Sequence, residues 1–403
     1  MSNPAITEPI RVSENGRYFV KQNNEPFFWL GDTQWELFRG YTLEEAEIIL
    51  ENRKAKGFTF IQVMITGMNN GTKPNLSGEK PWLNDNPATP NDAYFKNVDE
   101  VIQLGQQKGL VFVPGVFHQV QTANITMANA RTYTKWVAER YKDTPNIIWT
   151  SYPKAEKEFI PILREIAIGL QDGDQGKHLI SVHPDPSPAS SSFIHNEDWL
   201  ACNMIQTWAY YDRIYDMVTN DYNLIPTKPV LMVEGAYEDG SEYRFPVTPL
   251  MVRKQAYWTY LSGGHHSYGH NDSWRILPTW KSALDAPGAV QMGILKNLFT
   301  SLNWWDLVPD QSLIVNQQEH GKIFNVSSRS IFNDWAIVYL DKATTVSIDL
   351  KKLIASDKID AVWFNPATGT RKSIATFTNT IVQEFITPDE WEDAVLLLVK
   401  QKL

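Results

Sequence analysis

The sequence predicts an α/β protein, a (β/α)8 barrel followed by a small all-β antiparallel sandwich. Short apolar runs rich in β-branched and aromatic residues alternate with helical patterns through most of the chain, long enough for eight repeats. Beyond residue 310 the pattern changes to short alternating strands separated by turns, which is typical of a sandwich. The 403 residues are 43% hydrophobic and 21% charged, as in globular proteins. We therefore expect a barrel over residues 1–310 and a sandwich over residues 311–403.

The first half of the barrel carries the clearest local signals. Thr42 and Glu45 form a capping-box pattern at a helix start, and Gly57 suits the end of that helix. The expected elements are a hairpin at 12–25, a strand at 27–31, a helix at 42–56, a strand at 58–65, a helix at 91–108, a strand at 110–117, a helix at 126–141 and a strand at 146–151.

The second half continues the alternation, and its eighth strand has the weakest pattern. The expected elements are a helix at 156–171, strands at 179–183 and 204–207, a helix at 211–220, a strand at 229–234, a helix at 249–261, a strand at 263–268 and a closing helix at 287–302. In the sandwich we expect strands at 336–340, 345–350, 361–365 and 394–399, with a turn at 365–369.

Charge and composition exclude several function classes. With 37 Lys and Arg against 46 Asp and Glu, the formal charge of −9 provides no basic surface for a phosphate backbone, so no nucleic acid partner is expected. The single Cys202 excludes a disulfide framework within the chain. No stretch reaches the roughly 20 apolar residues of a membrane span, and the start shows no export signal, which favours a cytoplasmic location for the chain as given.

The aromatic content is the first functional indication. The chain has 15 Trp, 16 Tyr and 18 Phe, more than a core of this size requires. Sugar-binding sites use flat rings to cover apolar C–H faces, and a Trp-rich core is the alternative interpretation. Composition leaves both interpretations open.

Polar residues just past each strand are the candidate site residues, because the loops at the carboxyl ends of the strands form the concave polar surface of such a barrel. Two signatures of other chemistries, nucleotide-binding glycine loops and a Gly-x-Ser-x-Gly elbow, are absent from the sequence. The candidates that we select for substrate binding are Asp32, Trp35, His118, His183, Gln206, His266 and Tyr268. The wider set at the same strand ends comprises Glu36, Gln119, Tyr152, Asp185, Trp208, Tyr237, Glu238, His265 and His270.

Glu234 is the sharpest catalytic candidate. It ends the apolar run Val230–Val233, where a sheet would fix a carboxylate rigidly at the barrel mouth. A glycoside hydrolase needs such a carboxylate as nucleophile or base, together with a second carboxyl group as acid. A structural role at the strand end is the alternative.

The histidines at the predicted rim also raise the question of a metal site. His183, His265, His266 and His270 with nearby carboxylates could supply nitrogen and oxygen ligands. Their spacing does not match a helical zinc motif, so we favour hydrogen bonds to sugar hydroxyls and expect neither a metal nor another cofactor. For His183 a purely structural role is equally compatible with the sequence.

Motifs along nearly the whole chain resemble the apiosidase-like glycoside hydrolases, in which a (β/α)8 barrel precedes a small sandwich called a collagen-binding domain. The resemblance rests on Phe28-Trp29-Leu30-Gly31-Asp32-Thr33-Gln34-Trp35-Glu36, Pro145-Asn146-Ile147-Ile148-Trp149, Asn203-Met204-Ile205-Gln206, Pro229-Val230-Leu231 with Glu234, Tyr268-Gly269-His270-Asn271, Ala283-Leu284-Asp285-Ala286-Pro287-Gly288-Ala289, and Trp363-Phe364-Asn365-Pro366.

The resemblance implies that the carboxylate after the seventh strand, Glu234, is the nucleophile of a retaining-type arrangement. It also implies an aspartate acid after the fourth strand, but this chain has Lys154 there. A lysine with its ordinary pKa near 10.4 is a poor proton donor at neutral pH. Glu156, Glu158 or Asp185 could replace it, and we select Glu156.

The sequence thus predicts a glycoside hydrolase that cleaves a glycosidic bond in a polysaccharide or its side chains, with carbohydrate as its partner. A carbohydrate-binding pseudoenzyme on the same barrel is one alternative, because loss of the acid would leave the binding surface intact. A metal-dependent hydrolase is the other.

Overall fold

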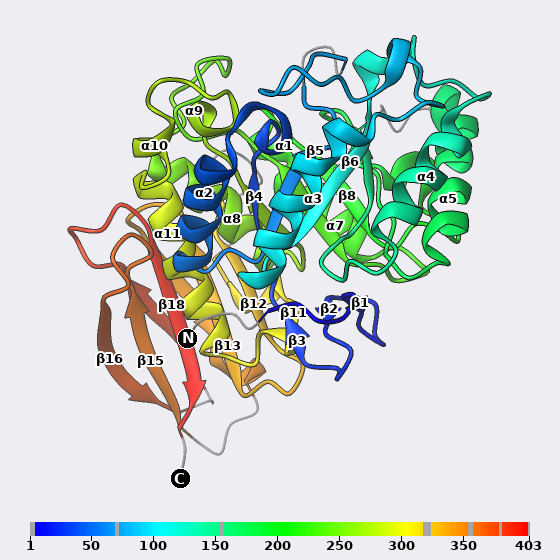
Figure 1. Ribbon diagram of the computed structural model, residues 1–403. Coiled ribbons are helices and arrows are strands. Elements are labelled where there is room, and N and C mark those ends of the chain that lie inside the picture. Colours follow the sequence, from blue (N-terminus) through cyan, green and yellow to red (C-terminus); the bar gives the residue numbers. More distant parts are fainter. Residues whose placement is uncertain are drawn as a thin grey trace.

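The computed structural model describes residues 5–68, 72–152, 157–316, 324–353, 358–378 and 381–401. In these residues a curved parallel sheet surrounded by helices is followed by an antiparallel β region, which lies against one side of it (Figure 1). The predicted fold class is confirmed.

The parallel sheet has the strand order β7-β6-β5-β4-β10-β9-β8 in the described residues. The strands are β4 (Leu30–Thr33), β5 (Phe60–Met64), β6 (Val111–His118), β7 (Thr150–Tyr152), β8 (Asn203–Gln206), β9 (Val230–Glu234) and β10 (His265–Tyr268). Each overlaps a strand predicted from the sequence. Such sheets are buried on both faces, which explains why these strands are apolar runs.

The predicted fifth strand is reduced to a single bridging residue. Ile180 forms parallel bridges with Trp149, just before β7, and with Leu200, just before β8, and so joins the two edges of the sheet into a ring. Backbone bonds toward β7 continue as far as His183, whose N–H donates to Ser151 over 2.8 Å. Pro184, Pro186 and Pro188 follow, and proline has no N–H to donate.

Helices cover the outside of the sheet. Thr42 caps α2 with the predicted reciprocal pair of bonds to Glu45, and Gly57 follows with a φ of +85°. The α-helices are α1 (Leu37–Gly40), α2 (Leu43–Ala55), α3 (Asp92–Gln107), α4 (Ala130–Tyr141), α5 (Ile160–Asp174), α6 (Ser191–Ile194), α7 (Ile214–Tyr222), α8 (Pro249–Leu261), α9 (Asn271–Trp274), α10 (Trp280–Ala283) and α11 (Pro287–Thr300).

The N-terminal segment closes the base of the barrel. The short strands β1 (Arg11–Val12), β2 (Phe19–Val20) and β3 (Pro26–Phe27) form a three-stranded sheet, one strand more than the predicted hairpin. Phe19 and Phe27 share one apolar cluster with residues in or just before the barrel strands, namely Trp29, Phe60, Val111, Val113, Ile148, Met204, Leu231 and Val233. The barrel interior is therefore a packed core, and its free polar end lies at the other side.

The C-terminal region contains a six-stranded antiparallel sheet of order β11-β12-β13-β18-β15-β16, and a two-stranded sheet formed by β14 and β17. The strands are β11 (Leu307–Pro309), β12 (Val326–Ser330), β13 (Trp335–Leu340), β14 (Thr345–Asp349), β15 (Ile359–Phe364), β16 (Arg371–Phe377), β17 (Val382–Ile386) and β18 (Ala394–Lys400). One apolar cluster joins the two sheets as a sandwich core.

Candidate active site

Glu234 lies at the carboxyl end of β9, in the position that the sequence predicts. The register between β8 and β9 shifts between Ile205 and Gln206, so that Gln206 stands opposite Glu234. This irregularity brings the side chains at the two strand ends together. Glu234 is 6% exposed, so its carboxyl group is nearly removed from solvent.

Hydroxyl, amide and imidazole groups surround the Glu234 carboxyl group. The Tyr152 hydroxyl lies 3.4 Å from Oε2 of Glu234 and also donates to Oε1 of Gln206 over 3.0 Å. His183 Nε2 lies 3.4 Å from the same Glu234 oxygen. The four side chains come from the ends of β7, β8, β9 and the shortened fifth strand, so the fold brings them together at the barrel mouth.

Burial dominates the electrostatics of Glu234. Loss of solvent raises the pKa of Glu234 to about 8, although hydrogen bonds from Tyr237, Tyr152 and Gln206 act to lower it. The charge of Asp185 raises the pKa further. A carboxyl group with these opposing influences is typical of active sites.

Stacked aromatic and imidazole rings form the wall beside Glu234. The His118 and Tyr152 rings stack with centroids 4.8 Å apart, and Tyr152 meets the His183 ring edge-on at 4.2 Å. Burial lowers the pKa of His118 to about 4 and that of His183 to about 3, so both imidazoles are neutral at pH 7. Nε2 of His118 has no hydrogen-bond partner within the described part of the chain, and Nε2 of His183 has none besides the Glu234 oxygen 3.4 Å away. Both nitrogens are buried in the structure.

Trp35 belongs to the same wall as a buried supporting residue. Its Nε1 donates to the Tyr237 hydroxyl over 2.9 Å, and its ring contacts Tyr152 and His183 at centroid distances of 5.7 and 5.5 Å. It is 2% exposed, so it holds the tyrosine and histidine in place and presents no open face.

Asp185 lies on the loop that follows the fifth strand, and both ends of this loop are fixed beside Glu234. At one end, His183 contacts Glu234, and its Nδ1 bonds the carbonyl of Pro184 over 3.0 Å. At the other end, the Ser187 N–H donates to the carbonyl of Gln206 over 3.2 Å. Asp185 is partly exposed, and its charge also raises the pKa of Tyr152.

Asp32 lies away from this group. It is completely buried, and its Oδ2 accepts bonds from Arg53 and Gln34, each at 2.8 Å. Burial raises the pKa of Asp32, opposed by the Arg53 charge. The placement is that of a structural ion pair behind β4, and it gives no support to a substrate contact.

The selected residues of the eighth strand are also directed elsewhere. The Tyr268 hydroxyl donates to Glu238 over 2.6 Å, and its ring contacts Phe58. His266 is 2% exposed, and burial lowers its pKa to about 3. The Tyr268 hydroxyl is thus bound to Glu238, and among the described residues no hydrogen bond or ion pair joins His266 to Glu234.

Two tyrosines at Glu234 were in the wider set of strand-end residues but not in our selection. Tyr152 is the last residue of β7, directly after the strand predicted at 146–151, and Tyr237 follows Glu234 by three residues. Their position after the predicted fourth and seventh strands was the sequence signal that could have identified them as site residues. Glu156 and Lys154 lie outside the described residues.

No group of three or more His, Cys, Asp and Glu side chains in the described part of the chain is placed to hold a metal ion. Within the same residues, no helix is long and apolar enough to cross a membrane.

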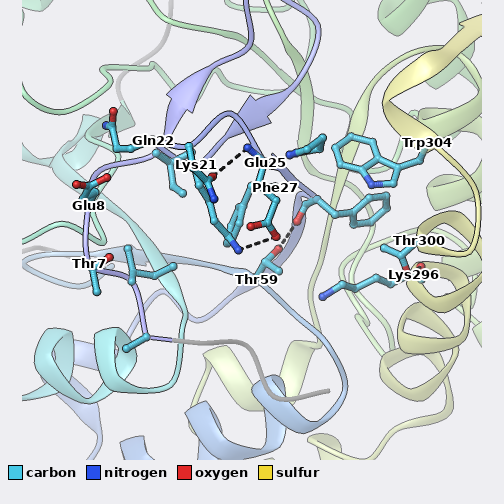
Figure 2. Close-up of a pocket in the computed structure, with 16 residues that line it drawn as sticks. Thr7, Glu8, Lys21, Gln22, Glu25, Phe27, Thr59, Lys296, Thr300 and Trp304 are labelled. Atoms are coloured by element: carbon cyan, nitrogen blue, oxygen red, sulfur yellow. Dashed lines mark hydrogen bonds and ion pairs between the residues drawn. The ribbon is translucent and has the colours of Figure 1, made fainter.

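A cavity of about 640 Å³ lies at the other end of the barrel (Figure 2). It is lined by the N-terminal segment, by Thr59 just before β5, and by Lys296 of α11. Because the amino ends of parallel strands lie opposite their carboxyl ends, this cavity is separate from the Glu234 group. Lys296 points into it and donates to the Gly57 carbonyl over 2.6 Å.

A carboxyl group at the end of the seventh barrel strand, surrounded by hydroxyl, amide and imidazole groups, is the kind of group that glycoside hydrolases use. Comparison with known proteins agrees. Residues 13–306 match the family described as "Apiosidase-like, catalytic domain", and residues 308–399 match the "Putative collagen-binding domain of a collagenase". The chain therefore belongs to the apiosidase-like family.

Solved structures support the same class. A protein described as a glycoside hydrolase is 28% identical, with a TM-score of 0.90, and the match covers 98% of this chain and 97% of that one. A glycoside hydrolase family 5 protein from Bacteroides vulgatus is 26% identical, with a TM-score of 0.91, covering 99% and 95% of the two chains. A search of curated proteins found no match.

Proposed function

We propose that this protein is a glycosidase that cleaves a glycosidic bond in a polysaccharide or its side chains, with Glu234 as the nucleophile. The observation that carries the proposal is the Glu234 carboxyl group itself. It is fixed at a strand end, nearly buried, and hydrogen-bonded by Tyr152, Tyr237 and Gln206. Family membership supports the reaction class.

In the first step the ionised Glu234 carboxylate attacks the anomeric carbon of the sugar. A carbon–oxygen bond to Glu234 forms while the bond to the leaving group breaks, and a second carboxyl group donates a proton to the leaving oxygen. In the second step a water molecule attacks the anomeric carbon and transfers a proton to the second carboxylate. The bond between the anomeric carbon and Glu234 breaks, which frees the Glu234 carboxylate. The sugar is released with retained configuration.

Asp185 is the second carboxyl group that we propose within the described residues. Its loop is anchored at His183 and Ser187, both beside the Glu234 group, and its partial exposure allows proton exchange with the leaving group or water. Its charge acts on Glu234 and on Tyr152. Glu156, selected from the sequence, remains a prediction.

Neutral His118 and His183 would bind sugar hydroxyls through their Nε2 atoms. Neither carries a charge at pH 7, because burial lowers both pKa values. A neutral imidazole can donate or accept, which suits a hydroxyl group that does both.

The test uses a panel of 4-nitrophenyl pentosides and hexosides with the wild type, Glu234→Gln, Asp185→Asn and Glu156→Gln. We expect Glu234→Gln to lower kcat by at least about a thousandfold. The exposed Glu139→Gln on α4 is the matched control and should keep wild-type activity. Azide added to Glu234→Ala should restore turnover and yield a glycosyl azide of inverted configuration.

The acid variants separate Asp185 from Glu156. Loss of the proton donor should lower kcat about a hundredfold or more for poor leaving groups, and much less for dinitrophenyl glycosides, which leave without a proton. Wild-type activity in Glu234→Gln would contradict the proposal. Sugar binding without turnover of any glycoside by the wild type would instead indicate a carbohydrate-binding pseudoenzyme.

A further inference from the structure

Trp208, two residues past the end of β8, has a backbone conformation that is unusual for an aromatic residue. Its φ is +47°, in the left-handed region that favours glycine. Any side chain with a Cβ carries a free-energy cost there, and such residues are concentrated at functional sites. The presence of the largest side chain at this position requires an explanation.

The backbone of Trp208 is attached to the catalytic candidate. The N–H groups of Thr207 and Trp208 both point at the carbonyl oxygen of Glu234, at 2.9 and 3.4 Å. Because Glu234 is fixed by β9, the position of Trp208 relative to the carboxyl group is also fixed. The backbone of Trp208 is therefore held at the same strand end as the proposed nucleophile.

The indole ring is only partly covered by protein. Trp208 has intermediate exposure, and its ring meets Tyr243 of the loop after β9 edge-on at 5.4 Å. The charge of Glu234 contributes to raising the pKa of Tyr243, which places this ring pair in the same electrostatic environment. The ring is thus less covered than those of Trp29, Trp149 and Trp258, which are buried.

We propose that the Trp208 indole is the platform on which the sugar ring next to the Glu234 carboxyl group stacks its apolar C–H face. The proposal deepens the glycosidase function and rests on it for the identity of the ligand as a sugar. Aromatic rings bind flat apolar surfaces over a broad area while leaving the polar rim of the ligand free to form hydrogen bonds. Nε2 of His118 has no hydrogen-bond partner among the described residues, and we assign one of those bonds to it.

Three variants test this role. Trp208→Phe keeps a smaller ring, Trp208→Ala removes it, and Trp208→Gly removes it while relieving the backbone conformation. Tyr210→Ala is the matched control, because Tyr210 is an exposed aromatic residue in the same segment. The substrate is the 4-nitrophenyl glycoside that the wild type hydrolyses fastest.

We expect KM to rise about three- to tenfold in Trp208→Ala and Trp208→Gly and less in Trp208→Phe. Circular dichroism and thermal melting must show that each variant is folded at the assay temperature, so that its KM change cannot arise from unfolding. Wild-type KM in both Trp208→Ala and Trp208→Gly overturns the platform. So does a KM increase of the same size in Tyr210→Ala.

Binding of the corresponding free sugars, followed by calorimetry with the wild type and Trp208→Ala, separates this proposal from the proposed function. Binding that weakens in Trp208→Ala supports the platform even when no glycoside is hydrolysed, in which case only the catalytic proposal fails. Turnover or binding that is unaffected by the loss of the ring overturns the platform alone. Neither turnover nor binding by the wild type overturns both.

Discussion

At the scale of single residues, the Glu234 carboxyl group is held between two opposing influences. Burial favours its protonated form, and the hydrogen bonds from Tyr237, Tyr152 and Gln206 favour its ionised form. Burial prevails and raises the pKa to about 8. A nucleophile must be ionised, so this pKa has consequences for the pH dependence of both activity and stability.

The first consequence concerns activity. If Glu234 is the nucleophile, we expect kcat/KM to fall about tenfold per pH unit as the pH decreases below about 8, because the free enzyme then carries a protonated carboxyl group. The measurement is kcat/KM for an activated aryl glycoside from pH 5 to 9. A decrease of kcat/KM with rising pH through the same range would assign Glu234 the role of proton donor.

The second consequence concerns stability. The carboxyl pKa of Glu234 is about 8 in the folded chain and has its ordinary value of 4.5 when unfolded, so the folded state binds the extra proton between these values. Its contribution to the free energy of unfolding is complete below pH 4.5 and is lost as the pH rises to 8, at up to about 1.4 kcal/mol per pH unit.

Glu234→Gln cannot titrate, so urea unfolding at pH 5 and pH 8 should show the variant gaining stability relative to the wild type as the pH rises. The exposed Glu139→Gln should show no such trend. An unchanged difference between Glu234→Gln and wild type at the two pH values would contradict the raised pKa.

At the scale of elements, the alternation of apolar runs and helical patterns predicted the barrel strands, because buried parallel strands and amphipathic helices differ in period. The capping box at Thr42 is a local signal and was also confirmed. The fifth strand was wrong in extent, since only Ile180 of the predicted residues 179–183 bridges both neighbouring strands, while the backbone bonds toward β7 continue to His183.

The candidate site was harder to predict than the elements. Position past a strand correctly placed His183 and Gln206 beside Glu234, but the strand pattern does not show which way a side chain points. The Tyr268 hydroxyl therefore bonds Glu238, and Asp32 pairs with Arg53, although both residues were also selected for their position at the end of a strand. The irregular register opposite Glu234 and the φ of Trp208 depend on tertiary packing, which no local pattern encodes.

At the scale of the whole molecule, the central strands β13 and β18 of the six-stranded sheet are buried on both faces, so the sandwich packs directly on the barrel. Alternate residues of β13 and β18, among them Ile337, Tyr339, Val395 and Leu397, pack in the cluster that includes α8 and α11 of the barrel. Their neighbours pack toward β14 and β17. Figure 1 shows the sandwich lying along these two helices.

A buried ion pair fixes this interface. Arg253 of α8 donates to both oxygens of Asp393, over 2.8 and 2.7 Å, and the Tyr339 hydroxyl donates to the same carboxylate over 2.8 Å. Arg253 is 1% and Asp393 2% exposed. Removal of one partner would leave an uncompensated charge in the interface, so the pair holds barrel and sandwich in register.

Arg253→Met should therefore lower the free energy of unfolding by about 3–5 kcal/mol, measured by urea denaturation. The double variant Arg253→Met/Asp393→Asn should recover much of this loss of unfolding free energy, because the neutral amide at position 393 can still accept the hydrogen bond from the Tyr339 hydroxyl. The exposed pair Arg131 and Asp172 is the control, and Arg131→Met should cost less than about 1 kcal/mol. Equal losses of unfolding free energy in Arg253→Met and Arg131→Met would show that the interface does not depend on the buried pair. In that case the barrel and the sandwich should unfold in separate transitions.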